Sequence, residues 1–126
     1  MAPRYAVEKV VAAAMSGDLN LVGSRAKDIV LTYVDGLIDA YSFAQALVAS
    51  LRLEQFQETV RLNPPYEGFF DLYICPLSPL LMSRYGLEHV TQWYVKLKLT
   101  ESESGDSVLV VSMHPPEQPA RPKRKP

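Results

Sequence analysis

A strict alternation of apolar and polar side chains near the C-terminus is the feature that most constrains the fold. Four apolar residues alternate with three polar ones, in the order Trp93, Tyr94, Val95, Lys96, Leu97, Lys98, Leu99. This period of two is typical of a β-strand with one buried and one exposed face. A polar turn over residues 101–106 and an apolar segment over 108–114 follow. Together these segments predict an antiparallel hairpin.

Directly opposed residues of an antiparallel pair share a face of the sheet, so the apolar positions suggest a register. The buried face is expected to pair Leu99 with Leu109, Leu97 with Val111, and Val95 with Met113. The same register places Tyr94 opposite His114, Lys96 opposite Ser112, and Lys98 opposite Val110. A slip of two residues would keep both faces and place His114 beside Lys96 or Gln92. Either register predicts one polar cluster on the exposed face.

The rest of the chain reads as helices followed by a further strand. Helical spacing of apolar residues predicts helices over residues 5–15, 24–34, 42–52 and 53–62, and Asn63 with two prolines ends the last one. Residues 69–74 predict a strand, and 75–91 a loop. The expected fold class is α+β, with N-terminal helices packed on a C-terminal three-stranded antiparallel sheet. We expect a single domain over 1–117 and a disordered, basic, Pro-rich tail over 118–126.

The charge is unevenly distributed along the chain. Of the 13 Lys and Arg residues, four lie in the tail, which has no acidic residue. Residues 1–117 therefore carry 9 basic and 14 acidic side chains, a net charge of −5. Nucleic-acid-binding domains usually carry a basic surface. Contact of this body with RNA would need a local basic patch.

Several classes of protein and site are excluded or disfavoured. One cysteine, Cys75, allows neither an intrachain disulfide nor a cysteine-based zinc site, and no set of residues has metal-ligand spacing. Cys75 is expected to be a small buried residue and His89 a surface residue. No apolar run approaches the ~18 residues of a membrane span, and the N-terminus lacks an apolar signal core. We expect a cytoplasmic protein with no membrane contact, no metal and no cofactor.

The residue types on the exposed hairpin face suit cleavage of an RNA phosphodiester. In that reaction the 2′-OH of the substrate is the nucleophile, and the protein supplies a base, an acid and positive charge. His114 could act as acid or base. Lys96 or Lys98 could hold phosphate oxygens, and Tyr94 could orient the phosphate, donate a proton or stack on a base. The alternative is an ordinary solvated strand face without any activity.

Five segments, at residues 7–11, 53–56, 69–73, 93–97 and 108–113, carry a resemblance to a known family. The most specific pieces are Asp71 and Tyr73 in one strand, Tyr94 and Lys96 in the next, and the apolar run into Ser112. In this order they resemble the MqsR-type toxins, mRNA interferases of bacterial toxin–antitoxin pairs with the RelE-like ribonuclease fold. The resemblance covers about residues 5–116.

The resemblance implies a type II toxin, a metal-independent endoribonuclease that cleaves mRNA and is neutralised by a cognate antitoxin with zinc-binding and DNA-binding domains. The family's catalytic tyrosine corresponds to Tyr94. Where the family has a lysine, a glutamine and a second lysine, this chain has Glu58, Phe70 and His114. We expect the catalytic residues to be Tyr94, His114 and Glu58, with Glu58 as a possible base to His114 as acid. The expected substrate-binding residues are Lys96, Lys98, Arg61 and Tyr73, where Arg61 lies one helical turn beyond Glu58.

Two other functions stay open from the sequence. The first is a catalytically silent protein of the same fold that binds a protein partner or regulates it. Glu58, the acidic body and an exposed Phe70 as a protein anchor would favour this alternative. The second is an RNA-binding module that uses the basic tail.

Overall fold

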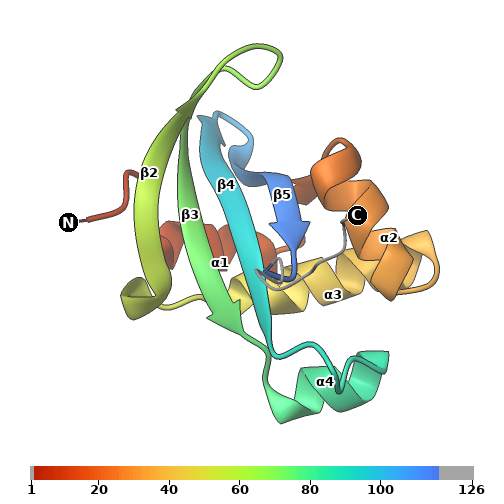
Figure 1. Ribbon diagram of the computed structural model, residues 1–126. Helices are drawn as coiled ribbons and strands as arrows, with labels where there is room; N and C mark the ends of the chain where they lie inside the picture. The colour runs from red at the N-terminus through yellow and green to blue at the C-terminus, as the bar shows by residue number, and fades with distance from the viewer. Residues whose placement is uncertain (1, 117–126) are drawn as a thin grey trace, which may run out of the picture.

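The computed structural model describes residues 2–116, so the predicted tail over 118–126 lies outside the described residues (Figure 1). The elements are, in chain order, α1 (Val7–Met15), β1 (Leu19–Leu21), η1 (Ser24–Asp28), α2 (Ile29–Tyr33), α3 (Leu37–Ala49), η2 (Leu53–Gln55), β2 (Phe56–Leu62), β3 (Gly68–Pro76), α4 (Pro79–Tyr85), β4 (Gln92–Ser102) and β5 (Gly105–His114). The π-helical turn η1 continues directly into α2, and η2 is a single 3₁₀ turn. The α+β class is therefore confirmed.

The sheet has five strands rather than the expected three. Its order is β1-β5-β4-β3-β2, and β1 runs parallel to β5 while the other neighbours are antiparallel. The three strands predicted from the sequence are β3, β4 and β5. The two that were missed lie at the edges, and each obtains its hydrogen bonds from a neighbour already in the sheet.

The helix predicted over residues 53–62 is wrong, because this segment forms η2 and then strand β2. Phe56 and Val60 are four residues apart, which fits a helix, but Thr59 and Val60 are β-branched and favour a strand. Pairing with β3 decides between the two conformations. The Phe56 ring packs edge-on against Tyr73 at 5.7 Å, and the Thr59 hydroxyl donates to Asp71 at 2.6 Å.

The helices α1 and α3 cover one face of the sheet, which we call the helix face (Figure 1). Residues Val10, Phe43 and Trp93 are fully buried there, and the Phe43 and Trp93 rings meet edge-on at 5.0 Å. The third helix begins at Leu37, five residues earlier than expected, directly after Gly36 with its positive φ of 90°. No helix within residues 2–116 is long and apolar enough to cross a membrane.

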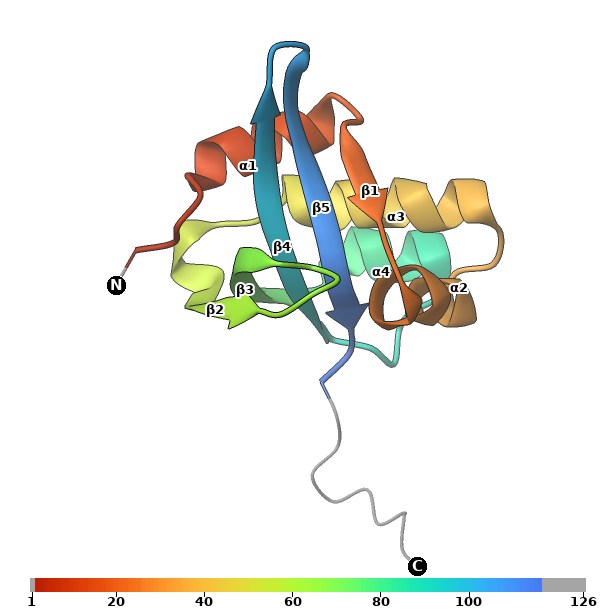
Figure 2. The same ribbon diagram turned by 90° about the horizontal axis from the view of Figure 1, so that it is seen from above.

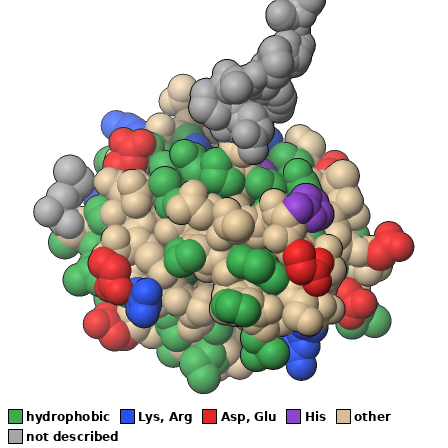
Figure 3. Space-filling model, turned by 60° about the horizontal axis from the view of Figure 1, so that its bottom comes forward, with side chains coloured by type: hydrophobic (Ala, Val, Ile, Leu, Met, Phe, Trp, Pro, Cys, Tyr) green, Lys and Arg blue, Asp and Glu red, His purple; other side chains and the backbone are tan. Residues whose placement is uncertain are grey.

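The predicted loop over 75–91 contains the short helix α4. The Ser78 side chain caps it by accepting a hydrogen bond from the Leu81 N–H at 3.2 Å, and Gly86 ends it with a positive φ of 68°. Figure 3 views the molecule from the side at the bottom of Figure 1, where α4 lies. Hydrophobic and uncharged side chains fill the centre of that view, and most charged side chains lie toward its edge.

The β4–β5 hairpin has the predicted register at one end and a β-bulge in its middle. Three pairs match the prediction: Tyr94 with His114, Val95 with Met113, and Lys96 with Ser112. A register shift follows between Lys96 and Leu97, so that three pairs differ from the prediction: Leu97 with Val110, Lys98 with Leu109, and Leu99 with Val108. The bulge places Val110 and Val108 in the core, where both are fully buried.

Asp71 ties the N-terminal segment to the sheet. Its carboxylate is fully buried on the helix face and accepts hydrogen bonds from the backbone N–H groups of Arg4 and Tyr5, at 3.0 and 2.9 Å. The Tyr5 hydroxyl donates to the Phe69 carbonyl at 2.7 Å. These bonds hold the start of α1 against the helix face of β3.

Candidate functional site

The open face of the sheet is the face opposite α1 and α3. Its side chains come from alternate positions of the four antiparallel strands, which include Glu58, Leu72, Ile74, Tyr94, Lys96, Lys98, Ser112 and His114. The loop between β2 and β3 folds across part of this face (Figure 2). The polar cluster predicted from the hairpin therefore lies on this face, with Tyr94, Lys96, Lys98 and His114 partly exposed. The predicted exposure of Ser112 is wrong, because this residue is buried.

Tyr94 and His114 lie side by side, as the register predicts. Their rings are stacked with centroids 5.6 Å apart and an angle of 25° between the planes. Both side chains are partly exposed. Lys96 points to the same face two residues along β4, which corresponds to ~7 Å along a strand. A phenol, an imidazole and an ammonium group therefore share one small area of surface.

The two ring nitrogens of His114 have different partners. Nδ1 lies 2.8 Å from the Pro115 carbonyl oxygen, and Nε2 lies 3.1 Å from the guanidinium of Arg25. A carbonyl oxygen only accepts hydrogen bonds and a guanidinium only donates them. Nδ1 therefore carries the hydrogen, and Nε2 presents its lone pair to Arg25.

Arg25 is a site residue that the sequence analysis missed. It lies in η1, 89 residues from His114 along the chain. The parallel pairing of β1 with β5 brings the two together, because it leads the chain after Leu21 toward the C-terminal end of β5. No local pattern around Arg25 indicates this, so only the missed strand β1 could have revealed it.

Lys98 belongs to the open face but supports the β2–β3 loop. Its Nζ donates to the Glu67 carbonyl at a long 3.5 Å and lies 5.5 Å from the centre of the Phe70 ring. Tyr66 of the same loop reaches Gly23, where a Cβ would collide with the Tyr66 hydroxyl. The loop thus bridges β3 and the start of η1 above the sheet. Lys98 is positioned beneath it rather than directed at His114.

Phe70 is fully buried beneath Lys98, so the expected exposed Phe70 does not exist. It lies on the open face of β3, where it pairs with Val60 of β2 and where the Lys98 ammonium lies over its ring. A buried ring cannot serve as an anchor for a protein partner. No local pattern in the sequence indicates this burial, because it depends on contacts between strands that are distant in the chain.

Two predicted substrate-binding residues lie away from the polar cluster. Tyr73 is fully buried on the helix face, and this burial raises the pKa of its hydroxyl above the ordinary value. Arg61 points to the same side of the sheet as Phe69, and its guanidinium lies 5.7 Å from the centroid of the Phe69 ring. The guanidinium of Arg4 lies 4.2 Å from the same centroid. Because Glu58 and Arg61 are three residues apart in a strand, they point to opposite faces, not to neighbouring helical turns.

Glu58 lies on the open face but far from His114. It pairs with Leu72 on β3, which pairs with Lys96 on β4, which pairs with Ser112 on β5. Three strand spacings separate β2 from β5, or ~14 Å of backbone. The structure does not bring Glu58 and His114 into direct contact. Glu58 is nearer to Lys96, two strands away.

The remaining titratable residues that the sequence singled out lie outside this cluster. Cys75 is buried, and burial raises the pKa of its thiol to about 12. His89 is exposed in the turn after α4. Among the described residues, no group of three or more His, Cys, Asp or Glu side chains is arranged to hold a metal ion.

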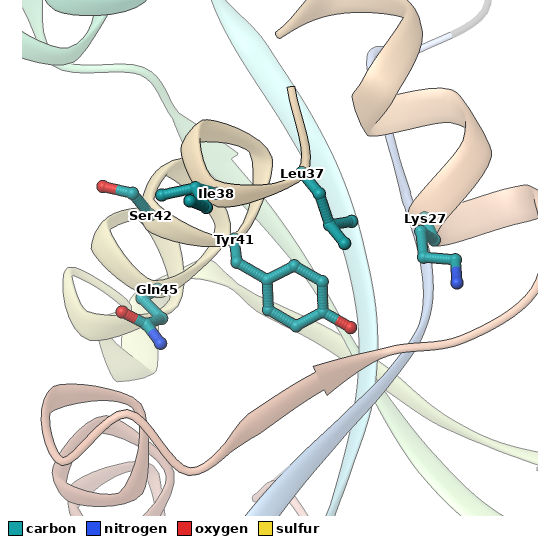
Figure 4. A pocket seen from close by; sticks show the side chains of 6 residues that line it. All are labelled: Lys27, Leu37, Ile38, Tyr41, Ser42 and Gln45. Carbon is teal, nitrogen blue, oxygen red and sulfur yellow. The ribbon is translucent and has the colours of Figure 1, made fainter. Parts of the chain in front are cut away.

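A separate hollow lies between η1 and α3. It is lined by Lys27, Leu37, Ile38, Tyr41, Ser42 and Gln45 (Figure 4). The Tyr41 hydroxyl accepts a hydrogen bond from the Leu21 N–H at 3.2 Å and lies 3.3 Å from the Leu21 carbonyl. Ser42 and Tyr85 share a hydrogen bond at 2.7 Å. The Tyr41 and Ser42 hydroxyls, which line the hollow, therefore already have hydrogen-bond partners within the fold. This hollow offers fewer groups for a reaction than the open face does.

Comparisons with known proteins assign no family to the chain. No protein-family model matches it, and the comparisons with curated proteins and with solved structures found no match.

Proposed function

We propose that the protein is an endoribonuclease that cleaves mRNA on the open face of its sheet. The observation that carries this proposal is the stacked pair of Tyr94 and His114 on an accessible surface, with Lys96 beside it. The reaction is attack of the substrate's own 2′-OH on the neighbouring phosphate. Because the nucleophile belongs to the substrate, the protein needs only proton transfer and stabilisation of negative charge.

The geometry supports one division of roles within the cluster. His114 accepts the proton of the 2′-OH, since its Nε2 has a free lone pair whenever Arg25 releases it. Tyr94 donates its hydroxyl hydrogen to the departing 5′ oxygen, and Lys96 places positive charge near the phosphate oxygens. This division differs from the sequence-based hypothesis, in which Glu58 is the base. Glu58 lies too far from His114 to share one phosphate with it.

The proposal extends to a toxin of the MqsR type in a type II toxin–antitoxin pair, acting in the cytoplasm. Its support is that the resembling segments 69–73, 93–97 and 108–113 lie in the neighbouring strands β3, β4 and β5, and the tyrosine of the resemblance lies beside His114. The partners of such a protein are its mRNA substrate and a cognate antitoxin that binds zinc and DNA.

A catalytically silent protein of the same fold, acting through a protein partner, is the second proposal. The exposed Glu58 on the open face favours it, because a carboxylate repels the RNA backbone. The buried Phe70 no longer supports it. Purification of a stable complex with a protein partner, together with absent RNA affinity, would favour this second function over the first.

A cleavage assay in the presence of a metal chelator tests the first proposal. We expect the wild type to cut mRNA and His114→Ala to cut it about 100-fold or more slowly, since a general base contributes a factor of this size. Tyr94→Phe should slow it by a similar factor, because this variant removes the proposed general acid. His89→Ala is the matched control and should cut at the wild-type rate. Unchanged rates in both site variants would remove this site, and a wild type that does not cut RNA would refute the activity.

A further inference from the structure

Arg25 places its guanidinium directly against a ring nitrogen of His114. Its guanidinium contacts Nε2 of His114 at 3.1 Å, and the side chain is otherwise exposed. Within residues 2–116, the salt bridges join Lys9 with Glu101 and Arg52 with Glu54, and Arg25 forms none. A guanidinium has five N–H donors in a planar fork. Arg25 therefore retains donors for an anion while it contacts His114.

The contact also constrains the imidazole. Nδ1–H donates to the Pro115 carbonyl at 2.8 Å, and the lone pair of Nε2 accepts from Arg25. Both partners favour the same tautomer, the one with hydrogen on Nδ1. The nitrogen that faces the open surface is therefore kept in the state that can accept a proton. While Arg25 occupies this lone pair, however, no other donor can use it.

We propose that Arg25 is a positioning residue for His114 and the phosphate-binding residue of the open face. At rest, Arg25 occupies the lone pair of Nε2 and so favours the tautomer with hydrogen on Nδ1. When a phosphodiester binds, its two anionic oxygens accept the guanidinium N–H groups as a bidentate pair, which is a stronger arrangement than one bond to a neutral imidazole. The lone pair of Nε2 is then free. This inference rests on the proposed ribonuclease activity for the identity of the phosphate as part of RNA.

The chemical step balances with the groups on this face. Nε2 of His114 takes the proton from the 2′-OH as the 2′ oxygen forms a bond to phosphorus. The bond from phosphorus to the 5′ oxygen breaks, and that oxygen takes a proton from Tyr94. The products are a 2′,3′-cyclic phosphate and a free 5′-OH. His114 is then protonated and Tyr94 ionised, until a proton passes from His114 to Tyr94. Arg25 stays bound to the phosphate oxygens and takes no proton.

Nitrogen NMR of the folded full-length protein tests the positioning role without any RNA. Protonated and unprotonated imidazole nitrogens have well separated ¹⁵N shifts, and His89 is the only other histidine, so it serves as an internal reference. At about pH 8, above the ordinary titration range of histidine, we expect a large shift difference between the two nitrogens of wild-type His114. Arg25→Met should reduce this difference, because the tautomers then mix. Arg25→Lys, which keeps a donor, should restore most of it.

Inorganic phosphate, added at constant ionic strength, tests the binding role. We expect the signals of the Arg25 side chain and of His114 Nε2 to change together, with one apparent affinity. Arg25→Met should weaken this affinity about tenfold or more, the effect of losing charge-assisted hydrogen bonds. Lys27→Met is the matched control, since it removes an exposed charge two residues away on the same turn. It should change the affinity little.

The two sets of results are separable from the activity. Unchanged His114 shifts in Arg25→Met would overturn the positioning role, and equal phosphate affinity in Arg25→Met and Lys27→Met would overturn the binding role. Both measurements use no substrate turnover. A wild type that does not cleave RNA therefore refutes the proposed function alone, whereas the NMR results decide the role of Arg25.

Discussion

The two faces of strand β4 have opposite relations to the rest of the molecule. On the helix face, Trp93, Val95 and Leu97 are fully buried beneath α1 and α3. On the open face, Tyr94 and Lys96 are partly exposed, the β2–β3 loop crosses nearby, and Arg25 of η1 contacts His114. One strand of 11 residues thus contributes both to the core and to the candidate site.

The difference shows how this fold separates stability from binding. Burial without a hydrogen bond is costly on the helix face, and there Asp71 has three donors around its carboxylate. The buried Tyr73 hydroxyl and the Trp93 indole N–H have no hydrogen-bond partner within residues 2–116, so this face satisfies its charged group but not every polar atom. Tyr94, Lys96 and His114 on the open face are partly exposed, so water can reach their polar atoms. Those groups are therefore free to exchange water for a ligand at little cost to the fold.

Two neighbouring alanine substitutions on β4 give the largest expected difference between its two faces. Leu97→Ala removes a fully buried side chain and should lower the free energy of unfolding by about 2–5 kcal/mol. Lys96→Ala, one residue away on the open face, should change it by about 0.5 kcal/mol or less but slow RNA cleavage. Urea denaturation and the cleavage assay measure the two effects. A stability loss of similar size in both variants would show that the open face also holds the fold together.

A pair of carboxylate-to-amide substitutions on neighbouring strands sharpens the comparison. Asp71→Asn keeps the shape of the side chain but turns an NH₂ group toward N–H and O–H donors, so at least one buried donor loses its partner. We expect a loss of about 2–3 kcal/mol in the free energy of unfolding. Glu58→Gln, exposed on the open face of β2, is the matched control.

The N–H groups that Asp71 holds give this prediction a local readout. Hydrogen exchange at the backbone amides of Arg4 and Tyr5 should accelerate in Asp71→Asn, because both donate to the lost carboxylate oxygens. Glu58→Gln should leave both exchange rates and stability close to the wild type. Equal stability of the two variants would contradict the structural role assigned to Asp71.

The sequence predicts those parts of the molecule whose conformation follows from local pattern. The alternation along β4 gives the strand, its two faces and the first three pairs of the hairpin, and hence the meeting of Tyr94 with His114. The helical spacing over 5–15 and 24–34 likewise gives α1 and the helix made of η1 and α2. In each of these cases, the apolar positions alone specify the buried face.

The parts that the sequence did not predict depend on contacts between distant segments. Residues 56–62 have apolar positions compatible with a helix, and they form a strand because β3 offers a free edge beside them. The bulge after Lys96 has no local signal either. Arg25 reaches His114 only through the parallel β1–β5 pair. The strand β1 has only three residues, which is too short for its periodicity to be recognised. The contact between Arg25 and His114 therefore could not be predicted from the sequence pattern.

The α4 helix is a different case, because its signals were present. Ser78 and Pro79 are typical of a helix start and Gly86 of a helix end. Taken one by one, however, Pro76, Pro79 and Gly86 predict a loop. The order of these residues is the informative feature, because a helix often has Pro at its first position and Gly directly after its last one.

Alkaline pH provides the smallest and most specific test of the helix face, through Cys75 on β3. Burial raises the pKa of this thiol from 9.0 to about 12, so the folded protein keeps its proton in a range where the unfolded chain loses it. Because the folded state binds more protons there, stability falls as the pH rises above 9.0. The thiol should account for about 1.4 kcal/mol of that fall by about pH 10.

Urea denaturation of wild type and Cys75→Ala, from about pH 8 to about pH 10, isolates this contribution. Cys75→Ala lowers the stability at every pH by creating a small cavity, so the slope with pH is the quantity to compare. We expect a shallower slope in the variant. Some dependence should remain near the upper end, because burial also raises the pKa of Tyr73 on the same face. An equal dependence of the free energy of unfolding on pH in the two proteins would mean that the thiol is accessible in the folded state. The helix face would then be less completely closed at β3 than the burial of Cys75 and Trp93 indicates.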